Sequence, residues 1–129
     1  MNLPELADLD PRLEISPYTL FRLLKCGEPL RLIDVRPPGG GDCERRTFAG
    51  AEAWGGPEGF PADGPPTVLF DDDGTRARGL ARQLQARGAA SVRALFGGLA
   101  LYDFCLDPRV VGEERFLARP LENDLDGGG

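Results

Sequence analysis

The chain has 129 residues, which is enough for one small domain. Its 21 acidic and 15 basic side chains give a formal net charge of −6, which argues against nucleic acid or an anionic membrane as the main partner, because either would favour a basic face. Histidine is absent, which excludes Ser-His-Asp and Cys-His catalysis, histidine-containing zinc sites and an imidazole base.

The sequence favours a cytoplasmic location. No apolar run approaches the roughly 18 residues that a membrane span needs. The start, MNLPELADLD, is acidic and lacks the pattern of a signal peptide. The three cysteines, an odd number with irregular spacing, suit reduced thiols better than a disulfide framework.

Apolar patterns and helix-breaking residues predict six elements in the order helix, strand, strand, helix, strand, helix. Their ranges are 16–27, 30–35, 67–70, 75–87, 91–95 and 99–104. Ser16 can cap the first helix, and Gly27 can end it. The alternation of strands and helices predicts an α/β domain with a small, mostly parallel sheet flanked by helices on both faces.

Glycine and proline are concentrated between the first two predicted strands. Residues 37–66 hold 14 of the 30 glycines and prolines in the chain, so this segment cannot form regular helix and is expected to be a long loop. The last ten residues, PLENDLDGGG, carry three acids and no base and are expected to fray.

The loop to inspect follows the central predicted strand, because ligands of parallel sheets meet the loops at the carboxyl ends of strands. Its residues are Asp71, Asp72, Asp73, Gly74, Thr75 and Arg76. A helix that begins after such a loop offers an anion site, but three carboxylates already supply negative charge there. We expect the acids to cap the helix and complement its dipole, a contribution of about 1 kcal/mol. A metal site or a carboxylate nucleophile is the alternative.

Four segments, in this order, resemble the rhodanese-like domain, a sulfurtransferase fold that a group of protein phosphatases shares. They are Ile15-Ser16-Pro17, Leu32-Ile33-Asp34-Val35-Arg36, the degenerate Arg46-Thr47-Phe48-Ala49-Gly50-Ala51, and Val92 to Tyr102, which contains Leu95-Phe96-Gly97-Gly98. The resemblance covers residues 14–104. It implies a rhodanese-like domain at 14–106, between an N-terminal extension at 1–13 and a C-terminal tail at 107–129.

Sulfurtransferases of this family carry sulfur on the cysteine of a C-x-x-x-x-R loop. In the alignment that the resemblance implies, Asp71 stands in the cysteine position and Arg76 in the arginine position. An aspartate cannot hold a sulfane sulfur, and Asp72 and Asp73 would repel an anionic donor by about 1 to 4 kcal/mol per close pair of charges. The resemblance therefore implies a catalytically degenerate module without cofactor, which binds a protein partner or a small ligand.

The resemblance also implies that two residues near this loop, Asp34 and Arg36, form supporting structural hydrogen bonds.

A second resemblance is local. Residues 67–75 are similar to the first motif of haloacid dehalogenase-type phosphatases, hhhh-D-x-D-G-T. That motif implies Asp71 as nucleophile, Asp73 as acid/base and Mg²⁺ bound by both. Only 54 residues follow Thr75, and the single lysine, Lys25, precedes the motif, so the context fits this family poorly. A cation-binding loop without turnover is a third alternative.

The cysteines give a further alternative, which is sulfur transfer through a displaced thiol. Cys43 is flanked by arginines and is expected to be exposed, so it could be a reactive thiol, whereas Cys105 is expected to be half-buried. Neither lies on a strand-to-helix anion loop, so a non-catalytic role is preferred for all three cysteines. Cys26 is expected to be a packing residue. Trp54 and Tyr102 are expected to be core or rim aromatics.

Overall fold

A computed structural model describes residues 8–36, 47–56, 58, 60, 64–106 and 117–118. Its main sheet has five parallel strands in the order β1-β6-β5-β2-β4. These are β1 (Glu14–Ile15), β2 (Arg31–Asp34), β4 (Glu52–Ala53), β5 (Thr67–Phe70) and β6 (Val92–Leu95). The strand at the centre, β5, has all four residues buried, as its continuous apolar sequence predicts.

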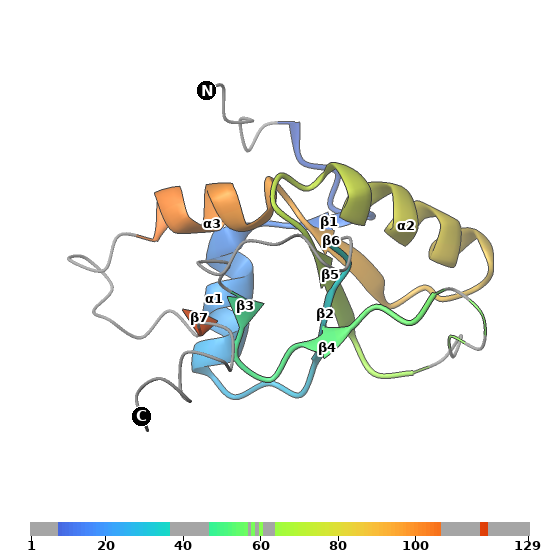
Figure 1. Cartoon of the computed structure of the whole chain (residues 1–129), viewed down its shortest axis with the longest axis horizontal. Helices are drawn as coiled ribbons and strands as arrows, with labels where there is room; N and C mark the ends of the chain where they lie inside the picture. The colour runs from blue at the N-terminus through green and yellow to red at the C-terminus, as the bar shows by residue number, and fades with distance from the viewer. Residues whose placement is uncertain are drawn as a thin grey trace, which may run out of the picture.

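Helices cover both faces of the sheet. The helices α1 (Pro17–Lys25) and α3 (Gly98–Cys105) lie on one side, and α2 (Thr75–Ala86) lies on the other (Figure 1). Because side chains alternate along a strand, Leu69 packs in the core beneath α2 while Val68 and Phe70 pack beneath α1 and α3. The predicted α/β architecture is therefore confirmed.

The two halves of the core are built from different side chains. Small residues of α2, Ala77 and Ala81, bring that helix close to the sheet. On the other side, the Phe48 ring stands edge-on to the rings of Phe70, at 4.9 Å, and Tyr102, at 4.8 Å. The aromatic cluster therefore holds α3 and the segment around β3 (Thr47–Phe48) against the sheet.

All six predicted helices and strands are present, with ends shifted by at most a few residues. The cap of α1 forms as expected, since Ser16 Oγ accepts a hydrogen bond from the Thr19 N–H at 3.1 Å. Gly27 follows the helix with φ +74°. Among the described residues, no helix is long and apolar enough to cross a membrane.

Four short strands were not predicted: β1, β3, β4 and β7 (Leu117–Ala118). Two of them, β3 and β4, interrupt the segment expected to be one long loop, and β7 pairs with β3 in an antiparallel ladder. Each has only two residues, which is too short to show the alternation that identifies a strand. The residue before β1 also joins the fold, because Leu13 is buried and its carbonyl accepts a hydrogen bond from the Ala94 N–H at 2.8 Å.

Candidate functional site

The loop between β5 and α2 closes around the side chain of Asp71. The residue is only 4% exposed, and its Oδ1 accepts a hydrogen bond from the Gly74 N–H. Its Oδ2 accepts from the N–H groups of Arg76, at 2.8 Å, and Ala77, at 3.3 Å. The carboxylate therefore lies against the amino end of α2, where unpaired N–H groups attract an anion.

The pKa of Asp71 lies above its ordinary value. Burial raises this pKa most, because it penalises the charged form, and the neighbouring charge of Asp73 raises it further. The hydrogen bonds from Gly74, Arg76 and Ala77 lower the pKa but do not cancel the effect of burial.

The backbone of the same loop caps α3. The carbonyls of Asp71 and Asp72 accept hydrogen bonds from the N–H groups of Leu99, at 2.9 Å, and Ala100, at 3.0 Å. Gly98 has φ +64°, and a Cβ there would lie 2.5 Å from the Asp72 carbonyl carbon. The close approach of the two backbones explains why glycine occupies this position.

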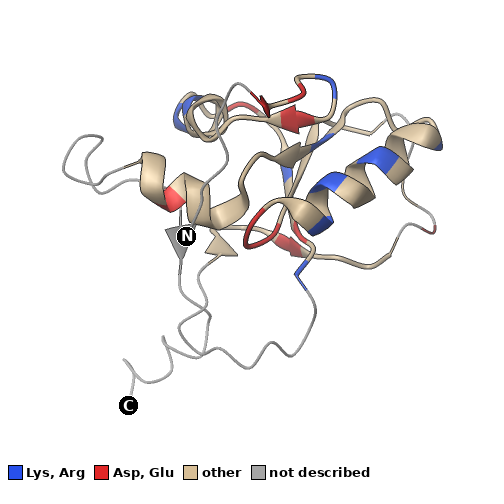
Figure 2. Cartoon of the chain, turned by 90° about the horizontal axis from the view of Figure 1, so that it is seen from above, with Lys and Arg blue, Asp and Glu red and all other residues tan. Residues whose placement is uncertain are grey.

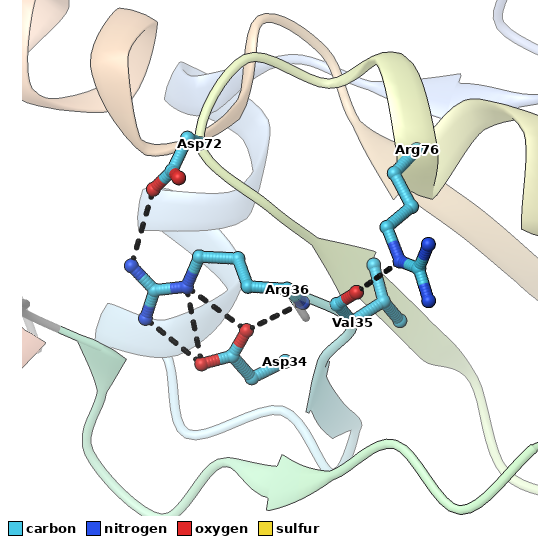
Figure 3. Close-up of polar contacts among 5 residues, drawn as sticks. All are labelled: Asp34, Val35, Arg36, Asp72 and Arg76. Atoms are coloured by element: carbon cyan, nitrogen blue, oxygen red, sulfur yellow. Dashed lines mark hydrogen bonds and ion pairs between the residues drawn. The ribbon is translucent and has the colours of Figure 1, made fainter. Parts of the chain in front are cut away.

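A second cluster joins the end of β2 to the loop (Figure 3). The guanidinium of Arg36 donates to Asp34 Oδ2 from Nη2 at 2.8 Å and to Asp72 Oδ1 from Nη1 at 3.2 Å. The Arg36 side chain is 4% exposed and lies over the Phe70 ring. Burial lowers the pKa of Arg36, but the hydrogen bonds and charges of Asp34 and Asp72 outweigh it and raise the pKa.

The remaining polar residues of the loop also bind within the chain. The Nε of Arg76 donates to the carbonyl oxygen of Val35, which turns this side chain toward β2 (Figure 3). Asp73 Oδ1 accepts a hydrogen bond from the Thr75 N–H at 3.0 Å. The structure thus brings Asp34, Arg36 and the loop 71–76 together at the carboxyl ends of β2 and β5.

The cysteines lie away from this loop in the described part of the chain. Cys26 is exposed, which corrects the expectation of a packing role, because the residue follows the last turn of α1. Cys105 is half-buried at the end of α3, and a hydrogen bond with it raises the pKa of Tyr18. Cys43 lies outside the described residues.

The two aromatics singled out from the sequence are not exposed. Tyr102 is fully buried, and Trp54 is half-buried and packs against the core beneath α2. Among the described residues, no three side chains of the types His, Cys, Asp and Glu gather into a group that could hold a metal ion.

Beside the loop is a pocket of about 320 Å³ that the sequence reasoning missed. Its lining combines the loop with β1, the outer side of α2 and the turn after β6: Glu14, Asp73, Gly74, Thr75, Arg78, Gly79, Arg82, Phe96 and Gly97. The signal in the sequence is weak, because Glu14 and the arginines of α2 come together only through the parallel packing of β1 beside β6.

Comparison with known proteins supports the fold through structure and not through sequence. No protein-family model and no curated protein matches the sequence. A rhodanese-related protein from Thermoplasma volcanium superposes with a TM-score of 0.54 at 14% identity, covering 70% of this chain and 89% of its own. A protein of unknown function from Rhodopseudomonas palustris, described as a possible tyrosine phosphatase, gives a TM-score of 0.61 at 16% identity, covering 74% and 82%.

The Alr3790 protein from Anabaena sp. gives a TM-score of 0.56 at 18% identity and covers 88% of this chain and 87% of its own. Identities this low carry the architecture and not the chemistry. With the parallel five-stranded sheet and its flanking helices, these likenesses show that the chain has a rhodanese-like fold.

Proposed function

We propose that this chain is a catalytically degenerate rhodanese-like domain that acts as a binding or regulatory module. The observation that carries the proposal is the Asp71 carboxylate, which accepts hydrogen bonds from the backbone N–H groups of Gly74, Arg76 and Ala77, in its own loop and the first turn of α2. In the sulfurtransferases that the sequence resembles, the amides of this loop face a sulfur held by cysteine. Here the Asp71 carboxylate is itself the anion that these amides bind. Their N–H groups are therefore not available to an external anion.

The charge around the loop also opposes anionic substrates. The guanidinium of Arg36 is already shared between Asp34 and Asp72, that of Arg76 donates to the Val35 carbonyl, and Asp73 adds an exposed carboxylate. A unit charge about 4 Å from another interacts by roughly 1 to 4 kcal/mol near a protein surface, so thiosulfate would be repelled.

The domain boundaries are part of the same proposal. We assign 14–106 to the rhodanese-like module, with 1–13 as an extension and 107–129 as a tail. Two contacts extend the packed region beyond these limits, the buried side chain of Leu13 and the pairing of β7 with β3. We also propose a cytoplasmic location, which the free thiols of Cys26 and Cys105 favour.

The test is sulfur transfer from thiosulfate or mercaptopyruvate to cyanide. We expect no turnover above buffer, and no persulfide on the intact chain by mass spectrometry. Robust turnover that is abolished by Cys43→Ser or Cys105→Ser would instead establish a displaced thiol as the sulfur carrier. The position of Cys105 disfavours that outcome, because it lies about two helical turns from the end of α3 that meets the loop.

The variant Asp71→Cys is the matched control for the proposal. A thiolate at position 71 could attack the outer sulfur of thiosulfate, forming a persulfide and releasing sulfite. We expect this variant to gain one sulfur atom slowly, because Asp72 and Asp73 still repel the donor. Gain of sulfur by the variant and not by the parent chain would assign the inactivity to the side chain at 71.

The phosphatase alternative predicts a different result. It requires Mg²⁺-dependent hydrolysis of a generic phosphate ester such as p-nitrophenyl phosphate, lost in Asp71→Asn. We expect no such activity, because both oxygens of Asp71 are turned toward backbone amides and the side chain is buried. Hydrolysis that depends on both Mg²⁺ and Asp71 would replace the proposal.

A further inference from the structure

The pocket beside α2 combines both signs of charge in a small space. Two carboxylates, Glu14 and Asp73, and two guanidiniums, Arg78 and Arg82, line it. Their formal charges cancel. A ligand that carries only negative or only positive charge would therefore meet repulsion as well as attraction, whereas a ligand with both charges can match both pairs.

Glu14 is the buried group of this pocket, with a side chain that is 5% exposed. Its Oε1 accepts a hydrogen bond from the Asp10 N–H at 3.0 Å. Its Oε2 lies 3.8 Å from Arg78 Nε, which is too far for a hydrogen bond, and accepts no hydrogen bond from the described residues. This oxygen therefore forms an ion pair with Arg78 without a hydrogen bond, and it can still accept a hydrogen bond from a ligand.

The wall formed by α2 carries features that weaken the helix. Gly79 lies in the helix interior, where glycine is less favourable than alanine, and a Cβ built on it would meet nothing within 4 Å. Arg78 and Arg82 are like charges one turn apart, and α2 contains no acidic residue to offset them (Figure 2). The ion pair with Glu14 accounts for Arg78, but no hydrogen bond or ion pair among the described residues accounts for Gly79 or Arg82, and all three residues line the pocket.

We propose that this pocket binds a small zwitterion of the α-amino acid class. The ammonium group donates to Glu14 Oε2, and the carboxylate pairs with Arg82, while the absent side chain at Gly79 leaves room between them. The amino end of α2 takes no part, because Asp71 and Asp73 already accept its first N–H groups. The proposal is independent of the lost sulfur chemistry, since Glu14, Gly79 and Arg82 lie outside the loop 71–76.

The test is titration of the full chain with each standard α-amino acid, followed by thermal unfolding and by amide NMR shifts. At least one amino acid should raise the Tm and shift the amide signals around Gly79. Its N-acetyl and carboxamide derivatives, which each lack one charge, should bind at least about tenfold more weakly. Failure of every amino acid to shift these signals would overturn the proposal, as would binding of either derivative as tightly as the amino acid itself.

Three variants separate binding from folding. Glu14→Gln and Arg82→Gln should each weaken binding of that amino acid at least about tenfold. Gly79→Ala should weaken it while raising the Tm of the free protein, so loss of binding cannot be attributed to unfolding. The control Arg87→Gln removes an arginine that follows α2 outside the pocket, and should leave the affinity unchanged. Wild-type affinity in all three pocket variants would contradict the assignment.

Discussion

The two sides of the junction between β5 and α2 differ in how their polar groups are satisfied. On the side that faces α3 and β2, the chain supplies nearly every partner: Asp71 accepts the loop amides, the loop carbonyls cap α3, and Asp72 pairs with Arg36. On the side that faces β1, Glu14 keeps one oxygen without a hydrogen bond, and Gly79 leaves open space. Where the chain satisfies its own polar groups, few remain to bind a ligand. Ligand binding is therefore expected on the side that faces β1.

The side that faces α3 and β2 is called the closed side below, because its polar groups are satisfied within the chain. The largest effect is expected from Gly98→Ala, which would disrupt this closed side. Alanine in a left-handed conformation costs about 1–2 kcal/mol. The Cβ would also lie 2.5 Å from backbone that cannot move aside, and overpacking adds about 1–3 kcal/mol. We expect a loss of about 3 kcal/mol or more in the free energy of unfolding, measured by urea denaturation.

Gly27→Ala is the matched control for this variant. Gly27 has a similar φ of +74°, but a Cβ there would meet nothing within 4 Å. It should therefore show the backbone strain without the steric clash, and lose clearly less stability than Gly98→Ala. Equal losses for the two variants would show that contact between the loop and the Gly97–Gly98 turn contributes nothing.

The next largest effect is expected from Asp71→Ala, which removes the internal anion. The N–H groups of Gly74, Arg76 and Ala77 then lose their acceptor in a buried place, at a cost of about 1–3 kcal/mol. Added sulfate should restore part of this loss by binding the vacated amides. Thermal unfolding in a sulfate series checks this, with Arg87→Gln as reference for the general effect of the salt. Identical sulfate dependence in Asp71→Ala and the reference would contradict an anion site at the loop.

The comparison also shows what sequence can reveal. The closed side was predictable, because Asp71 to Arg76, Gly97 and Gly98 are short segments whose spacing follows a family pattern. The hydrogen bonds that these residues form could not be predicted. The resemblance implies that Asp71 replaces the cysteine, but it does not imply that the Asp71 carboxylate accepts hydrogen bonds from the loop amides.

The pocket on the side that faces β1, called the open side, was not predicted for a different reason. Glu14 and Arg82 are separated by 67 intervening residues, and only the placement of β1 at the edge beside β6 brings them to one pocket. β1 itself has two residues and no periodicity to detect. Contacts between distant segments depend on strand order, which local patterns do not encode.

Gly79→Ala tests the open side, by comparing the effect of alanine at position 79 with its effect at position 98. The same substitution that destabilises position 98 should stabilise position 79 by up to about 1 kcal/mol, because alanine favours the helix and no atom obstructs its Cβ. Urea denaturation of the free protein measures the change. A loss of stability would mean that the helix needs glycine at this position, and would remove one argument for a ligand there.

The smallest effect is a dependence on pH, measured as the difference in unfolding free energy between the parent chain and Asp71→Asn. Burial raises the folded pKa of Asp71 above its ordinary value of 3.8, so the folded state binds this proton more tightly than the unfolded state. The contribution of Asp71 is then fully present below about pH 3.8 and is lost as the pH rises through the folded pKa. The parent chain should therefore lose stability relative to Asp71→Asn as the pH is raised from this value.

Glu52 provides the control with the opposite sign. Its hydrogen bonds with Arg31 lower its pKa below the ordinary value of 4.5, so its contribution is present above that pH and is lost as the pH falls through the folded pKa. The difference between the parent chain and Glu52→Gln should thus slope in the other direction. A rising slope for Asp71 as well would mean that the loop amides outweigh burial and favour the charged carboxylate. The closed side would then hold its internal anion even more firmly than the burial of Asp71 indicates.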